Sequence, residues 1–169
     1  KEVDALQHKV DEQVALFIAK RQPMASDLRE AIGALRMATD IERIGDLGEN
    51  IARRSFEIED NLPPKKLIRG LKHLTSVTQE QMKDVLDAYA SRDIERAKQV
   101  WERDDEIDSL YTSLFREMLT YMMEDPRTIT YCTHLLFCAK NMERIGDHVT
   151  NLAETIHYLV TASYDINAA

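Results

Sequence analysis

Two pairs of acidic residues in this sequence have a spacing that places each pair on one helix face. Glu42 and Asp46 lie in DIERIGDLGENIA, the first ERIGD segment, and Glu143 and Asp147 lie in NMERIGDHVTNLA, the second ERIGD segment. Glu143 follows Glu42 by 101 residues. Residues four apart are neighbours on a helix, and like charges at that spacing destabilise it. The repeated pattern therefore indicates that a cation compensates the carboxylates.

A third acidic pair, Asp104 and Asp108, interrupts the apolar stripe of a helix that we predict over 93–123. If this helix forms an antiparallel hairpin with one over 126–163, the pair lies about 18 residues before the turn and the second ERIGD segment about 20 after it. The two acidic pairs should then meet at one level of the bundle. Burying carboxylates costs several kcal/mol each unless something cationic compensates them.

Asp4 holds the corresponding position in the first half of the chain. It lies in VDAL, which matches IDSL around Asp108. A helix over 1–20 would place Asp4 near the level of the first ERIGD segment. The counterpart of Asp104 would precede the first residue given, so we expect this motif to be incomplete.

Converging carboxylates favour hard cations, because these prefer oxygen ligands. The sequence predicts divalent or trivalent ions, with iron, zinc, manganese and magnesium as candidates. The expected metal ligands are Asp4, Glu42 and Asp46 in one site, and Asp104, Asp108, Glu143 and Asp147 in the other. The alternative is that these acids face solvent and pair with Arg43, Arg144 or a nearby lysine.

The spacing of the apolar residues is helical along the whole chain. It predicts helices over 1–20, 24–57, 64–90, 93–123 and 126–163, with Ser91 as the N-cap of the fourth. Only 5 Gly and 4 Pro punctuate 169 residues, of which 44% are hydrophobic. We therefore expect an all-α fold with a substantial core.

The repeat divides these helices into two three-helix bundles in tandem. Residues 1–60 would form the first, lacking its N-terminal helix, and 64–163 the second. The missing helix should leave an apolar stripe bare, made of Val3, Leu6, Val10, Val14, Phe17, Leu28, Leu35, Ile41 and Ile51. Exposed apolar patches drive association, so we expect self-association, most simply as a symmetric dimer.

The net charge and the residue types disfavour several classes of function for this protein. The net charge of -8 disfavours nucleic acid, which needs a basic face, and suits cations or basic partners. We see no run apolar enough to span a membrane. Cys132 and Cys138 are expected to be buried free thiols. No catalytic constellation is visible. A di-metal oxidoreductase remains an alternative, although Glu154 and His157 supply only one of the two ExxH pairs it needs; a purely structural bundle is another.

The two ERIGD segments, together with RQPMASDLR and DDEID, resemble the PhoU family from the first residue to about residue 160. Members are six-helix, two-bundle cytoplasmic regulators of phosphate uptake. The resemblance implies a non-enzymatic negative regulator that acts with the ATPase subunit of the phosphate ABC transporter and with its sensor histidine kinase, and that commonly dimerises. It also implies multinuclear metal clusters. The matching motif residues are Glu42, Asp46, Asp104, Asp108, Glu143 and Asp147, with Asp4 as the surviving half of the remaining motif.

Overall fold

The computed structural model describes residues 1–58 and 64–166 of the chain, and these residues form helices and no strand. The helices are α1 (Glu2–Arg21), α2 (Ser26–Phe56), α3 (Lys65–Ser91), α4 (Ile94–Glu102), α5 (Asp104–Glu124) and α6 (Ile129–Thr161), with a 3-10 turn, η1 (Pro126–Thr128), before α6. The predicted all-α class is confirmed. Over the residues described, none of these helices combines the length and the apolar character that crossing a membrane requires.

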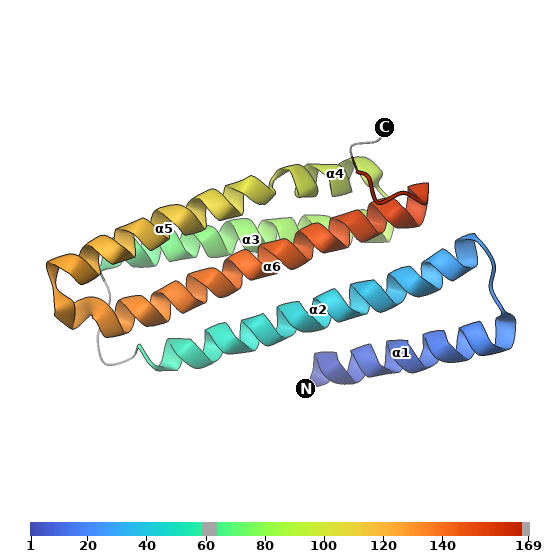
Figure 1. The fold of residues 1–169 in the computed structure, drawn as a ribbon, viewed down its shortest axis with the longest axis horizontal. Helices are drawn as coiled ribbons and strands as arrows, with labels where there is room; N and C mark the ends of the chain where they lie inside the picture. Colours follow the sequence, from blue (N-terminus) through green and yellow to red (C-terminus); the bar gives the residue numbers. More distant parts are fainter. Residues whose placement is uncertain (59–63, 167–169) are drawn as a thin grey trace.

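The helices run side by side along the long axis of the molecule, and α6 lies in the middle of them (Figure 1). It packs against α2 on one side and against α3, α4 and α5 on the other, whereas α1 packs against α2 alone among the described elements. One core cluster joins α3, α5 and α6 through Leu67, Leu74, Ile107, Leu114, Met118 and Leu135. A second joins α2, α3, α4 and α6 through Met37, Val85, Val100, Val149, Leu152 and Ile156.

The helix expected over 93–123 is in fact two helices that meet at Arg103. No Gly or Pro marks this break in the sequence, and a tertiary contact supports it: the fully buried Gln81 donates a hydrogen bond of 2.9 Å from Nε2 to the Arg103 carbonyl oxygen. The expected N-cap at Ser91 is also wrong. Asp93 caps α4, because its side chain accepts a hydrogen bond from the Arg96 backbone N–H.

The break changes which face of α5 is buried. Ile107 and Met118 point into the core, while Asp104 is half-buried and Asp108 is exposed. The interpretation of Asp104 and Asp108 as core positions is therefore wrong. It assumed one continuous helix, whereas the break at Arg103 changes which residues of α5 face the core. Both residues instead lie at the edge of the packed face.

The helix α2 of the first sequence repeat packs on α6 of the second. Met37 is buried in the same cluster as Val149 and Leu152, and Ile41 and Ile51 are partly covered. The expectation that the α2 apolar residues lie bare is therefore only partly correct, since α6 covers one side of them.

Two glycines in equivalent repeat positions, Gly45 and Gly146, have different surroundings. A Cβ on Gly146 would lie 2.9 Å from Cδ1 and 3.2 Å from Cγ2 of the buried Ile107. A Cβ on Gly45 would lie 3.7 Å from Val3, which is ordinary contact. Close helix packing at this level therefore requires glycine in the second repeat only.

Gly146→Ala should destabilise the fold, whereas Gly45→Ala should be neutral or stabilising. Overpacking costs about 1–3 kcal/mol, and replacing Gly by Ala inside a helix gains up to about 1 kcal/mol. We expect a net loss of about 1–2 kcal/mol at Gly146 and a gain of up to about 1 kcal/mol at Gly45. Urea unfolding of the two variants measures the contrast, and equal effects would contradict it.

Candidate metal centres

The first acidic cluster is formed where α1 lies against α2. Asp4 comes from α1, and Glu42 and Asp46 come from one face of α2. One carboxylate oxygen of each residue lies within 4.8 Å of an oxygen of each other residue. Oxygens that share one cation at about 2.3–2.6 Å can be no more than about 5 Å apart. The three side chains therefore have the spacing that a single hard cation requires.

A cationic side chain already lies beside this cluster. Arg43 Nε is 3.7 Å from Glu42 Oε2. The Arg43 contact is the one expected if the acids simply pair with a nearby cation. The Arg43 side chain is exposed, however, and exposed pairs contribute little to stability, so a metal ion could displace it.

The second acidic cluster combines Asp104 and Asp108 of α5 with Glu143 and Asp147 of the antiparallel α6. Asp108 and Asp147 are exposed overall, but partial loss of hydration raises the pKa of both carboxyls. The neighbouring Asp104 and Glu143 carboxylates raise both pKa values further. The four acids that the sequence places at one level are thus close enough to repel one another.

The second cluster is more open than the first. Within residues 1–58 and 64–166, only Asp4, Glu42 and Asp46 bring three such ligand atoms within 4.8 Å of one another. The sequence led us to expect the more complete site in the second repeat. The structure brings those four residues together without drawing their oxygens to a common point.

Two residues that the sequence analysis did not single out explain this openness. Lys140 donates to Glu143 Oε1, and Thr150 donates to Asp104 Oδ1 at 3.0 Å. The other Glu143 oxygen, Oε2, is buried and has no hydrogen-bond partner in the described part of the chain. Helical spacing could have identified Lys140, because it precedes Glu143 by three residues. The lysine therefore supplies a positive charge beside the second acidic cluster.

The remaining candidate ligands point elsewhere. Glu154 Oε1 accepts a hydrogen bond from Trp101 Nε1 at 3.3 Å, and His157 Nδ1 lies 2.9 Å from the Ser163 carbonyl oxygen. The two side chains of the ExxH pair are therefore held by separate partners. Cys132 and Cys138 are buried free thiols, as expected, and burial raises the pKa of both.

Comparison with known proteins gives a consistent assignment. The PhoU domain model matches residues 1–55 and 71–156. A phosphate-specific transport system accessory protein PhoU homolog of Rhizobium meliloti is 59% identical over 161 residues, covering 95% of this chain and 68% of the relative. A homolog of the same name from Caulobacter vibrioides is 50% identical, covering 94% and 69%.

A solved structure agrees with the sequence relatives. The crystal structure of PhoU from Pseudomonas aeruginosa superposes with a TM-score of 0.91 at 36% identity, covering 96% of this chain and 78% of that one. The family model, the relatives and the helical architecture all lead to the same conclusion. This chain belongs to the PhoU family.

Proposed function

We propose that this chain is part of a non-enzymatic cytoplasmic regulator of phosphate uptake that holds metal ions on its two acidic clusters. Its membership in the PhoU family supports a regulatory role in phosphate transport, since its relatives are named accessory proteins of the phosphate-specific transport system. The observation that carries the metal-binding part is the convergence of Asp4, Glu42 and Asp46 oxygens within 4.8 Å.

The metal ions would act through the helices that hold their ligands. Asp4 belongs to α1, while Glu42 and Asp46 belong to α2, so an ion would tie these two helices together. In the second cluster an ion would tie α5 to α6 and would compete with Lys140 for Glu143. Binding to the folded state alone adds stability by mass action.

The proposed partners are the ATPase subunit of the phosphate ABC transporter and the cytoplasmic region of its sensor histidine kinase, which together would hold down the starvation response. A net charge of -8 favours basic partner surfaces. Charge complementarity of this kind speeds association and is screened by salt. The regulator would work as a dimer.

A pull-down from phosphate-replete cells tests these partners. The tagged full-length protein should recover the ATPase subunit and the kinase, and recovery should fall as salt rises from about 0.05 M to about 0.5 M. Cells that lack the transporter operon provide the control for non-specific capture. Recovery of neither protein at low salt would contradict the proposal.

A further inference from the structure

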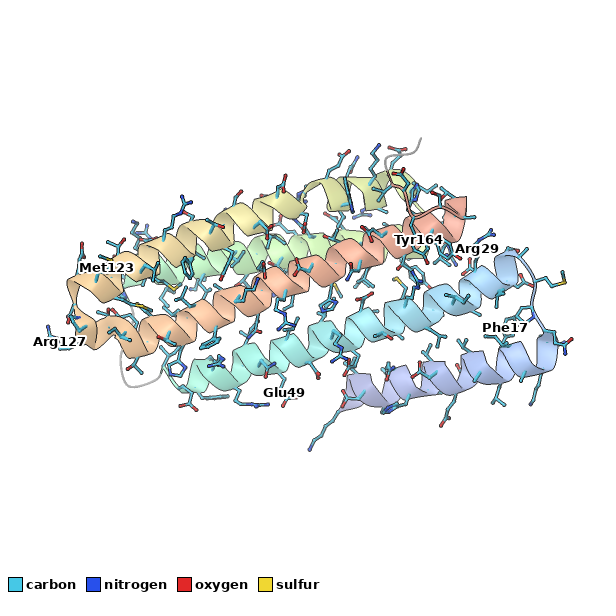
Figure 2. The ribbon with its side chains drawn as sticks, in the orientation of Figure 1. Phe17, Arg29, Glu49, Met123, Arg127 and Tyr164 are labelled. Carbon is cyan, nitrogen blue, oxygen red and sulfur yellow. The ribbon has the colours of Figure 1, made fainter. Side chains whose placement is uncertain are left out.

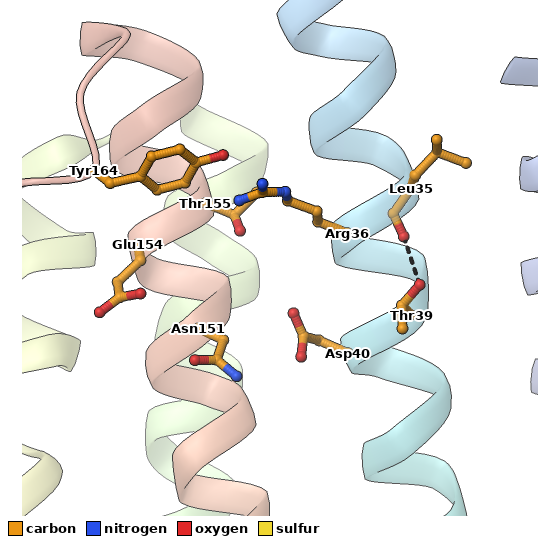
Figure 3. Close-up of a pocket in the computed structure, with 8 residues that line it drawn as sticks. All are labelled: Leu35, Arg36, Thr39, Asp40, Asn151, Glu154, Thr155 and Tyr164. Carbon is orange, nitrogen blue, oxygen red and sulfur yellow. Dashed lines mark hydrogen bonds between the residues drawn. The ribbon is translucent and has the colours of Figure 1, made fainter.

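An open polar groove of about 350 Å³ lies between α2 and α6 (Figure 3). Its walls are Leu35, Arg36, Thr39, Asp40, Asn151, Glu154, Thr155 and Tyr164. This volume is within the range of small-molecule sites, which commonly form where two structural units meet. Here the two units are α2 of the first sequence repeat and α6 of the second, which pack against each other.

Opposite charges face this groove without neutralising each other. Arg36 and Asp40 are four residues apart on α2, a spacing at which such residues commonly form an ion pair. Each is instead held by another residue. The Arg36 guanidinium lies 4.8 Å from the centroid of the Tyr164 ring, and Asp40 Oδ1 lies 2.8 Å from Nδ1 of His148 on α6.

The Tyr164 ring fixes the position of the guanidinium. Tyr164 is stacked on Tyr158, with ring centroids 4.1 Å apart and an angle of 7° between the planes. Figure 2 labels Tyr164 beside the last turns of α6, where the chain turns back along the helix. A guanidinium placed over an aromatic ring keeps its N–H groups available at its edge. Among the described residues, no carboxylate lies within 4.0 Å of Arg36.

Other polar groups complete the lining. Figure 3 shows the Asn151 side chain directed from α6 toward Asp40 with its amide nitrogen foremost, and Arg36 reaching toward Thr155. The second oxygen of Asp40 is not used by the His148 contact. A plain anion that bound Arg36 would be repelled by Asp40, and a plain cation would be repelled by Arg36. Glu154 adds a second carboxylate to the lining, and its Oε1 accepts the Trp101 hydrogen bond. With one guanidinium and two carboxylates, the lining favours a ligand that carries both charges.

We propose that this groove binds a small zwitterion, with a carboxylate on Arg36 and an ammonium group on the Asp40 carboxylate oxygen that His148 leaves free. Guanidinium and carboxylate form paired, charge-assisted hydrogen bonds, which are stronger than neutral ones. The occupant would bridge α2 and α6 and stabilise their contact. Its binding site would therefore lie between the two repeats.

A series of ω-amino acids tests this site, because its members keep both charged groups and change only their separation. Glycine, β-alanine, γ-aminobutyrate and 5-aminovalerate would be titrated separately into isotope-labelled protein, with the Asn151 side-chain amide followed by NMR. We expect a saturable shift from at least one member. Butyrate and butylamine, which each carry one charge, should bind at least about tenfold more weakly than γ-aminobutyrate or a longer member.

Two variants separate the site from general charge effects. Arg36→Gln should weaken binding at least about tenfold, because it removes the charge-assisted contact. Arg53→Gln removes an exposed arginine on the same helix, outside the groove, and should leave binding unchanged. The proposal is overturned if no member of the series gives a saturable shift, if a singly charged compound binds equally well, or if Arg36→Gln binds as the unchanged protein does.

Discussion

Replacing Asp108 and Asp147 together with alanine should raise the melting temperature of the metal-free protein and lower that of the metal-loaded protein. Without metal, the raised pKa values of both groups mean that their ionised forms are disfavoured in the fold. With metal, the same carboxylates are ligands, and their loss removes the stabilisation that comes from binding. Thermal unfolding with and without chelator measures this crossover.

The control variant removes the same amount of charge elsewhere. Glu95→Ala combined with Glu124→Ala deletes two exposed carboxylates on α4 and α5. This control should show no crossover.

Metal analysis of protein purified without chelator should show that Asp108→Ala with Asp147→Ala loses most of the metal bound by the second repeat. Unchanged metal content would show that the ligands are assigned wrongly.

The same carboxyls set an expected pH dependence for the metal-free protein. Their pKa values are raised above the ordinary 3.8, so between 3.8 and the raised values the folded state binds more protons than the unfolded state. Stability should therefore increase as the pH falls through the raised pKa values toward 3.8. The double variant should lack this increase, and urea titrations across this pH range would reveal it.

Replacing Leu6 and Phe17 of α1 with lysine should disrupt self-association of this chain. Val14 is buried, and α1 packs on α2, but the α1 residues Leu6 and Phe17 are 58% and 39% exposed. Exposed apolar surface favours association, so we expect dimers at concentrations on the order of tens of micromolar. Leu6→Lys with Phe17→Lys should shift sedimentation toward the monomer.

Leu119→Lys combined with Met123→Lys provides a matched control, because these residues are exposed apolar positions on α5. This control should leave the dimer unchanged if α1 forms the contact. Sedimentation of the unchanged chain as a monomer, with no binding of a hydrophobic dye, would contradict the prediction.

Periodicity located most of the helices well, because their ends lie near Pro or polar turns. The range 64–90 became Lys65–Ser91, and 126–163 became a short 3-10 turn followed by Ile129–Thr161. The break at Arg103 had no such signal. It depends on Gln81, which is 22 residues away in sequence, and a pattern confined to one helix contains no information about that contact.

The sequence predicted which helix faces carry the acidic residues, but it did not predict the distances between their carboxylate oxygens. The repeat correctly placed Glu143 beside Asp104 and Asp108. It did not indicate that Lys140 would hold Glu143 while Asp4, Glu42 and Asp46 came closer together. Side-chain rotamers and local ion pairs decide such distances, and helical spacing does not specify them. Whether either cluster holds metal is a prediction that the experiments above address.

The central position of α6 has a consequence for synthesis of the protein on the ribosome. The apolar faces of α2, α3, α4 and α5 pack against α6, which follows them in the chain. At about 5–20 residues per second, the 33 residues of α6 take about 2–7 seconds to be added. Throughout that interval four amphipathic helices lack their common partner, so nascent chains arrested before Ile129 should be sensitive to proteases and should bind chaperones.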